Sequence, residues 1–145
     1  MAEMVIFAKD ILEKDFLTMP GDTSASDAAK LMNEKRHGFV IISSESWPEG
    51  IVTEWDYLSK ITSQGRDPAR VKLSEIMTKD LVAVKDSDSF DYIAKLMSER
   101  GIRRVLVTKD NKVVGVITSR TVLARLQEYV DRISSLIART QSPSF

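Results

Sequence analysis

Two pairs of polar residues stand at the same spacing, and the pair that contains an aspartate could bind a sugar and a phosphate. Thr53 precedes Asp56 by three residues, and Thr118 precedes Thr121 in the same way. Each pair follows a short apolar run and opens a predicted helix, so both side chains should lie at one helix mouth beside free backbone N–H groups. A carboxylate there can accept both hydroxyls of a ribose, while the threonine hydroxyl and the helix N-terminus can bind a phosphate.

The same residues, Thr53 and Asp56, also fit a capping box that needs no ligand. In a capping box the threonine closes the start of the helix, and the acidic residue three positions later accepts from the backbone. The sequence leaves both interpretations open, and the two are compatible.

An internal duplication underlies this spacing. Sliding the chain along itself by 65 residues superposes identical residues over some fifty positions without a gap. The aligned identities include Ile11 and Ile76, Ser24 and Ser89, Leu31 and Leu96, Val40 and Val105, Gly50 and Gly115, and Thr53 and Thr118. The chain therefore carries two copies of one structural unit.

Each copy is predicted to fold as a βαββα unit. The expected strands are 16–19, 39–43 and 50–53 in the first copy and 81–84, 104–108 and 112–118 in the second. Serines cap the first helix of each copy, and the closing helices begin at Glu54 and Ser119. One unit leaves a sheet face uncovered, so we expect an α+β, sandwich-like fold in which two sheets pack together with pseudo-twofold symmetry. Two related clefts then lie between the copies.

The predicted organisation has four parts. Residues 1–64 form the first repeat with an N-terminal segment, 65–72 a linker containing Gly65 and Pro68, 73–126 the second repeat, and 127–145 a helical extension with a tail. The extension carries apolar residues at spacings of three and four, namely Leu123, Leu126, Val130, Ile133 and Ile137. This stripe is expected to pack either on residues 4–12 or in a dimer, and the dimer is favoured.

Composition narrows the possible functions. The 145 residues carry 21 basic and 21 acidic side chains, which argues against nucleic-acid or membrane binding driven by overall charge. Cysteine is absent and His37 is the one histidine, so no metal site is expected. The sequence shows no glycine-rich phosphate loop and no nucleophile with an adjacent base, so we expect no enzymatic activity. A cytoplasmic location is expected, because no long apolar segment is present.

The motif glycine, two apolar residues, threonine, two residues, aspartate resembles that of the tandem cystathionine-β-synthase (CBS) domain pair, or Bateman module. It stands complete at Gly50–Asp56, whereas the second copy, Gly115–Thr121, ends in threonine. The resemblance covers residues 10–126. It implies a regulatory module that binds AMP, ADP or ATP, with S-adenosylmethionine less favoured, signals to an unidentified partner protein and forms a homodimer. The alternative is a structural dimerisation module whose clefts are vestigial.

The resemblance also implies the site residues. The cleft of Thr53 and Asp56 should receive phosphate-binding residues from the other copy, and the matching positions are Arg103, Arg104 and Arg120. The backbone of the first strand, at Phe16, Leu17 and Thr18, should bind the adenine edge, with Phe39 or Val40 as a packing neighbour. The other cleft has Thr121, Gly38, Phe39 and Trp55 at the equivalent positions. We therefore expect one competent nucleotide site, with the second cleft empty, weak or used for something apolar.

Overall fold

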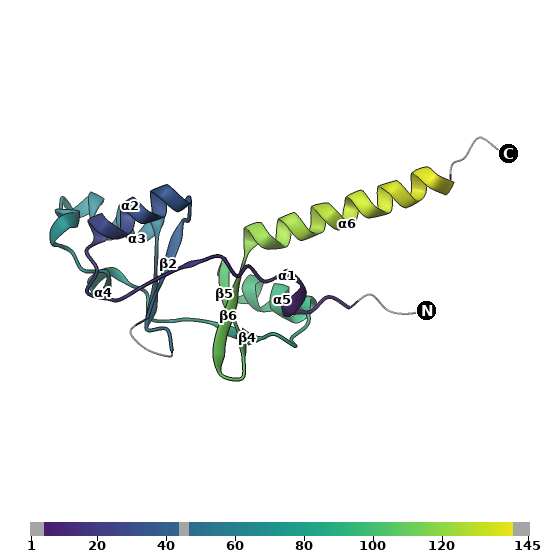
Figure 1. Cartoon of the computed structure of the whole chain (residues 1–145), viewed down its shortest axis with the longest axis horizontal. Helices are drawn as coiled ribbons and strands as arrows, with labels where there is room; N and C mark the ends of the chain where they lie inside the picture. The colour runs from purple at the N-terminus through teal and green to yellow at the C-terminus, as the bar shows by residue number, and fades with distance from the viewer. Residues whose placement is uncertain (1–4, 44–46, 141–145) are drawn as a thin grey trace.

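The computed structural model describes residues 5–43 and 47–140 as two three-stranded sheets with helices around them (Figure 1). The first sheet contains β1 (Leu17–Met19), β2 (Phe39–Ile42) and β3 (Gly50–Thr53), and the second β4 (Ala83–Lys85), β5 (Arg104–Lys109) and β6 (Lys112–Thr118). The α-helices are α1 (Ala8–Ile11), α2 (Ala25–Lys35), α3 (Glu54–Lys60), α4 (Leu73–Ile76), α5 (Phe90–Arg100) and α6 (Ser119–Thr140), and two 3-10 helices, η1 (Thr62–Gln64) and η2 (Pro68–Arg70), lie between α3 and α4. The predicted α+β class and the two βαββα units are confirmed.

Both sheets have the same topology. The first strand pairs in parallel with the second, and the second pairs antiparallel with the third. Val40 lies opposite Val52 in one sheet, and Val105 lies opposite Ile117 at the equivalent position of the other. The offset of 65 residues therefore relates not only residue types but also hydrogen-bonding registers.

The long helices of the two repeats begin alike and end differently. Ser24 caps α2 by accepting from the Asp27 N–H at 3.0 Å, and Ser89 caps α5 by accepting from the Tyr92 N–H at 3.2 Å. Both helices end in a left-handed residue, which is Gly101 after α5 but Arg36, with φ of 57°, after α2. A side chain with a Cβ disfavours this conformation, so the first repeat carries backbone strain that the second avoids.

Each repeat completes its core with a short helix that precedes the other repeat. Ala8 and Ile11 of α1 are buried among the second repeat's residues, whereas Leu73 and Ile76 of α4 are buried in the first repeat. Such four-residue helices show no readable period in the sequence, so this exchange was not anticipated. Because neither repeat has a full core without the other's segment, the two should fold together.

The two motif glycines allow these exchanged segments to approach. The backbone of Thr78 pairs with β3 at Ile51, and the backbone of Glu13 pairs with β6 at Val116. A Cβ on Gly50 would lie 2.9 Å from the Thr78 carbonyl oxygen, and one on Gly115 would lie 2.9 Å from that of Glu13. The motif glycine therefore has a packing role, whatever the cleft binds.

The sheets of the two repeats face each other across a small apolar layer. Its buried members are Phe39, Ile41, Leu106 and Val116, and Phe16 is among the partly buried residues packed against them. The predicted sheet-to-sheet packing is confirmed.

Helix α6 is 22 residues long, has no buried residue and extends away from the sheets (Figure 1). Its apolar side chains remain largely exposed, as at Leu126 (46%), Val130 (53%) and Ile137 (52%). The predicted stripe therefore exists. No other segment within residues 5–43 and 47–140 covers it. The predicted tail at 141–145 lies outside the described residues. No described helix has both the length and the apolar character to span a bilayer.

Candidate functional site

Two cavities related by the internal symmetry lie between the repeats. The first, of about 450 Å³, contains Thr53 and Asp56, and we call it the Asp56 cavity. The second, of about 570 Å³, contains Thr118, Arg120 and Thr121, and we call it the Arg120 cavity. Both volumes lie in the range of small-molecule sites.

The Asp56 cavity is built by both repeats. The first contributes Thr53 and Asp56 from the junction between β3 and α3. The second contributes Arg103 and Arg104 at the start of β5, together with an apolar wall at Leu81 and Val82. A carboxylate, two guanidinium groups and an apolar surface therefore converge on one space.

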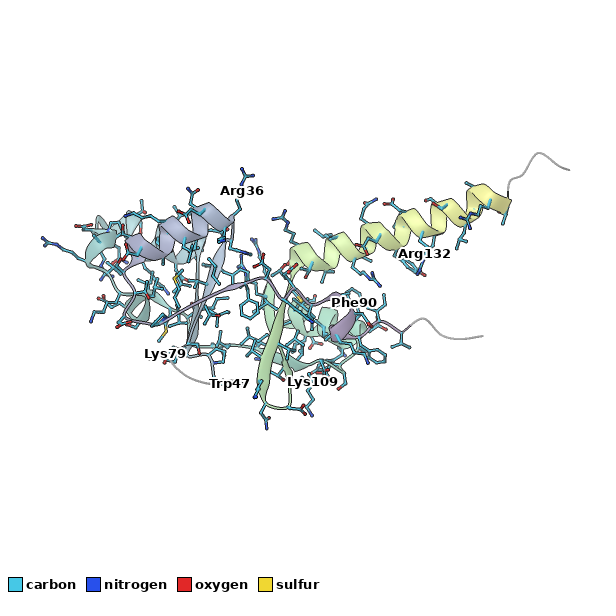
Figure 2. The ribbon with its side chains drawn as sticks, in the orientation of Figure 1. Arg36, Trp47, Lys79, Phe90, Lys109 and Arg132 are labelled. Atoms are coloured by element: carbon cyan, nitrogen blue, oxygen red, sulfur yellow. The ribbon has the colours of Figure 1, made fainter. Side chains whose placement is uncertain are left out.

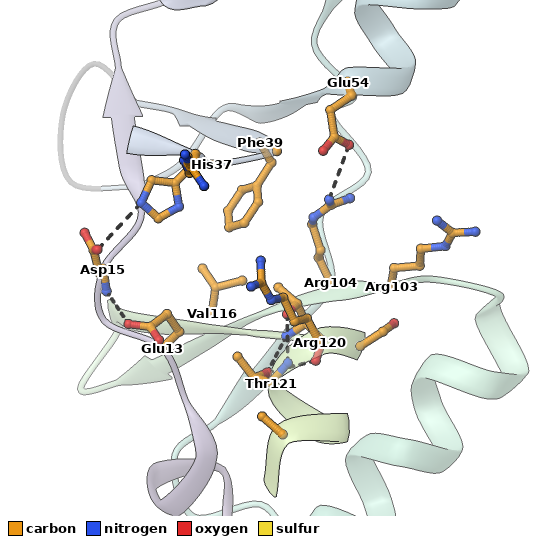
Figure 3. Close-up of a pocket in the computed structure, with 15 residues that line it drawn as sticks. Glu13, Asp15, His37, Phe39, Glu54, Arg103, Arg104, Val116, Arg120 and Thr121 are labelled. Carbon is orange, nitrogen blue, oxygen red and sulfur yellow. Dashed lines mark hydrogen bonds and ion pairs between the residues drawn. The ribbon is translucent and has the colours of Figure 1, made fainter. Parts of the chain in front are cut away.

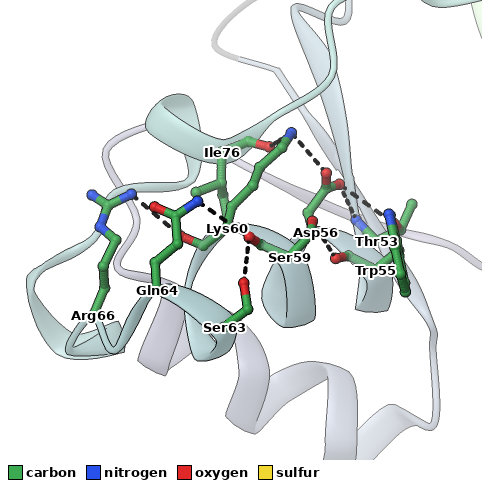
Figure 4. A network of polar contacts seen from close by, with 9 residues as sticks. All are labelled: Thr53, Trp55, Asp56, Ser59, Lys60, Ser63, Gln64, Arg66 and Ile76. Carbon is green, nitrogen blue, oxygen red and sulfur yellow. Dashed lines mark hydrogen bonds and ion pairs between the residues drawn. The ribbon is translucent and has the colours of Figure 1, made fainter.

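Asp56 caps its own helix while it lines the cavity (Figure 4). Its Oδ2 accepts from the Thr53 backbone N–H at 2.8 Å and from the Thr53 Oγ1 at 3.4 Å. The capping interpretation is thus confirmed for the carboxylate. A carboxylate offers about four lone-pair sites, so this cap does not exhaust the acceptor capacity of Asp56.

Lys60 offsets the cost of burying the charge of Asp56, whose side chain is only 7% exposed. The Lys60 Nζ lies 2.8 Å from Asp56 Oδ1 and donates to the Ile76 carbonyl oxygen at 2.7 Å (Figure 4). Because Ile76 belongs to the exchanged helix α4, this lysine links the charge at the cavity to the packing of the two repeats.

Arg104 lies on the wall that the two cavities share. Its guanidinium lies over the Phe39 ring, 5.0 Å from the centroid, and its Nη2 is 3.8 Å from Glu54 Oε2 (Figure 3). Its Nε is buried and has no hydrogen-bond partner in the part of the chain that is described. Burial lowers the pKa of Arg104, Glu54 opposes this shift and Arg103 adds to it, but a guanidinium stays charged at neutral pH. A half-buried cation with an unsatisfied donor faces both cavities.

The Arg120 cavity has the same framework without the aspartate. The Thr118 N–H donates to Thr121 Oγ1 at 2.9 Å, and the Thr121 N–H donates to Thr118 Oγ1 at 3.2 Å. Two hydroxyls therefore perform the capping that Thr53 and Asp56 perform in the first repeat. The cavity lining also includes Arg36, Arg103, Arg104, Arg120 and Phe39.

Of the predicted site residues, Thr53, Asp56, Arg103 and Arg104 line one cavity, but Arg120 lines the other. The expectation that three arginines converge beside Asp56 is therefore wrong. Arg120 belongs to the first turn of α6 and therefore stays at the helix mouth of its own repeat. Its counterpart in the first repeat, Trp55, lies beside Asp56 in the Asp56 cavity.

The predicted adenine-reading strand also lies elsewhere. Phe16 packs in the apolar layer between the sheets, Leu17 packs on the first core and Thr18 is exposed; none of them lines the Asp56 cavity. Their counterparts Leu81 and Val82 line it instead, since the symmetry places the second repeat's first segment beside the first repeat's motif. The offset of 65 could have identified these two residues.

The second cleft differs from its expected character as well. Phe39 lines it as expected, but four arginines line it too, so the expected lack of a cluster of cations is wrong. Arg36 was missed because its counterpart is Gly101, which carries no side chain to suggest a role. Among the described residues, no group of three or more histidine or acidic side chains could hold a metal ion.

The comparisons with known proteins agree with this architecture. The model of the CBS domain matches residues 8–63 and again residues 73–128. The chain belongs to the CBS-domain family. An uncharacterized protein of Methanopyrus kandleri is 31% identical to this CBS pair over 116 residues, which are 79% of this chain and 59% of that protein.

Two solved structures are similar to this CBS pair. A hexameric CBS-CP12 protein from bloom-forming cyanobacteria is 32% identical, with a TM-score of 0.75 over 84% of this chain and 72% of that one. The CBS domain pair of protein MJ0100, solved with 5-methylthioadenosine and S-adenosyl-L-methionine, is 28% identical, with a TM-score of 0.75 over 86% of this chain and 98% of that one. CBS pairs thus include proteins that bind adenosine-containing ligands and proteins that self-associate.

The chain spans only part of the first curated relatives that it matches. It covers 59% of the Methanopyrus protein and 24% of a homoserine O-acetyltransferase of Methanohalobium evestigatum, with which it shares 29% identity over 125 residues. The similarity to that enzyme is thus confined to a minor part of its length.

Proposed function

We propose that this CBS pair is a regulatory module that binds an adenine nucleotide in the Asp56 cavity and signals its occupancy to a partner protein. The observation that carries the proposal is the convergence of Asp56 from one repeat with Arg103 and Arg104 from the other on a single cavity. A ligand that contacts both repeats stabilises their packed arrangement, and a partner can read that change.

Each wall of the cavity has a proposed role. Thr53 and Lys60 leave about one lone pair of Asp56 free, so this carboxylate accepts one ribose hydroxyl directly and a second in place of the 3.4 Å bond from the Thr53 hydroxyl. The apolar surface of Leu81 and Val82 packs against the adenine ring. Arg103 and Arg104 bind phosphate oxygens through charge-assisted hydrogen bonds. This assignment replaces the predicted contacts at Phe16, Leu17 and Thr18.

The charges of the lining favour a ligand with few phosphates. Two arginines face three carboxylates, those of Glu54, Asp56 and Asp80, of which Asp56 is already paired with Lys60. A monophosphate can pair with the two guanidinium groups, whereas each further phosphate adds negative charge beside these carboxylates. Among AMP, ADP and ATP we therefore favour AMP.

Isothermal titration with AMP, ADP, ATP and S-adenosylmethionine tests this proposal. Asp56→Asn keeps an oxygen that can accept the Thr53 cap but removes the charge, and it should weaken AMP binding by about tenfold or more. The matched control is Thr121→Asn, which places the same amide at the equivalent position of the other cavity and should leave AMP binding unchanged. Equal AMP affinity in the wild type and Asp56→Asn would contradict the ribose assignment.

A structural dimerisation module is the second candidate, favoured by the exposed apolar stripe on α6. Thermal melting distinguishes the two functions, because a ligand that binds only the folded state must raise the melting temperature. No shift with any adenosine ligand at millimolar concentration would favour the dimerisation role.

A further inference from the structure

The Arg120 cavity gathers more positive charge than the cavity assigned to the nucleotide. Four arginines, Arg36, Arg103, Arg104 and Arg120, face three carboxylates there. This excess of cations is the reverse of the balance in the Asp56 cavity, where two arginines face three carboxylates.

The carboxylates of this cavity already have partners. Glu54 lies 3.8 Å from Arg104, Asp15 lies 3.7 Å from the His37 Nε2, and Glu13 accepts from the Asp15 N–H at 2.9 Å (Figure 3). In contrast, the guanidinium groups of Arg36, Arg103 and Arg120 form no ion pair with any described residue. Cations that are near one another and unneutralised favour a multivalent anion.

Arg36 supplies an independent observation. It occupies a left-handed position with φ of 57°, where the other repeat has Gly101 with φ of 60°. Its side chain extends into solvent from the end of α2, at the rim of the cavity (Figure 2). A strained residue whose long cationic side chain has no partner within the described chain suggests a role in binding rather than in folding.

We propose that the Arg120 cavity binds a compact anion with several phosphate groups, and that it recognises the phosphates rather than a nucleoside. Thr121 replaces the aspartate that would accept a ribose diol, so this cavity lacks the main group proposed to select a nucleoside. Its arginines can form bidentate bonds to adjacent phosphates.

The two cavities should also be coupled. Arg103 and Arg104 line both of them, and a guanidinium engaged by a phosphate on one side has fewer donors for the other side. A polyphosphate in the Arg120 cavity should therefore weaken phosphate-dependent binding in the Asp56 cavity. This coupling rests on the proposed nucleotide function, whereas polyphosphate binding does not.

Isothermal titration with inorganic tripolyphosphate, at constant ionic strength and without divalent cations, tests the site. Arg36→Gln and Arg120→Gln should each weaken binding by about tenfold, while Arg139→Gln removes the same charge far along α6 and should have no effect. Asp56→Asn should also leave tripolyphosphate binding unchanged. Equal loss in all three arginine variants, or no binding by the wild type, would overturn the proposal.

Further titrations distinguish a free polyphosphate from the phosphates of a nucleotide. They also distinguish the polyphosphate site from the proposed nucleotide function. If the Arg120 cavity recognises phosphates alone, the Asp56→Asn variant should bind ATP about as well as tripolyphosphate. The same variant should bind AMP much more weakly. In the wild type, saturating tripolyphosphate should weaken AMP binding several-fold, and unchanged AMP affinity would refute the coupling. If AMP fails to bind at all while tripolyphosphate binding still depends on Arg36 and Arg120, the nucleotide function fails and the polyphosphate site stands.

Discussion

Arg104 of the second repeat lies over the ring of Phe39 of the first, with its Cζ 5.0 Å from the ring centroid. This contact joins β5 to β2 across the boundary between the repeats. It also positions the guanidinium that lines both cavities. The stability of the interface and the charge available for binding therefore depend on the same pair of residues.

A double-mutant cycle on this pair should reveal a favourable coupling. Phe39→Leu keeps an apolar side chain and Arg104→Met keeps a long one, so both variants should fold. We expect a coupling free energy of about 0.5–1 kcal/mol from urea unfolding, because the cation and the ring attract each other. Additive effects of the two substitutions would show that the contact contributes nothing to stability.

Arg36 offers a substitution that should stabilise the fold. Arg36→Gly relieves the left-handed strain at φ of 57° and should raise the free energy of unfolding by about 1 kcal/mol. The reciprocal change, Gly101→Ala, introduces strain at φ of 60° with no neighbouring atom within 4 Å, so it should cost a similar amount. Chemical denaturation of both variants measures these two changes in the free energy of unfolding. A destabilised Arg36→Gly would mean that the arginine side chain makes a structural contact after all.

Tyr57 should make the stability pH-dependent in the alkaline range. Its hydroxyl donates to the Ala25 carbonyl oxygen at 2.7 Å, and burial raises the pKa of Tyr57 from 10.0 to about 12. Between these two values the folded state holds a proton that the unfolded state has released, so the free energy of unfolding should fall as the pH rises. Below this range the contribution is fully present.

The control is Tyr57→Phe, which lacks the hydroxyl. It should cost about 1 kcal/mol near neutral pH, from the loss of one hydrogen bond. Across the alkaline range its stability should fall less steeply than that of the wild type. Parallel pH profiles for the two proteins would be evidence against a pKa of Tyr57 raised by burial.

The apolar stripe on α6 should mediate self-association. Ile133 is 39% exposed in the single chain, so Ile133→Lys should leave the fold intact while it charges the stripe. We expect light scattering after size exclusion to show a dimer for the wild type and a monomer for this variant. Ser135→Lys lies about 200° around the helix and is the matched control. A monomeric wild type would contradict the prediction that α6 forms a dimer contact.

The sequence predicted the elements well because the repeat supplies each of them twice. A shared apolar pattern, such as Ala28, Leu31 and Met32 against Ile93, Leu96 and Met97, supports a helix more strongly than either copy alone. The exchanged helices were missed because Ala8 and Ile11 gain their partners only from the other repeat. Four residues are too few to reveal a buried face.

The candidate site was predicted in part, for a geometric reason. Thr53 and Asp56 are close in sequence, so their shared helix mouth follows from local structure. That Arg120 lines the other cavity, and that Phe16 packs between the sheets, depends on how the two sheets pack, which no local pattern encodes. Leu81 and Val82 entered the site through that packing.

The most direct test of the account is to follow the backbone amide signals by NMR during a titration with AMP. We expect shifts at Thr53 and Asp56 in the first repeat and at Leu81, Val82 and Arg104 in the second, all fitting one dissociation constant. Shifts confined to a single repeat, or none at millimolar AMP, would contradict a nucleotide site built by both.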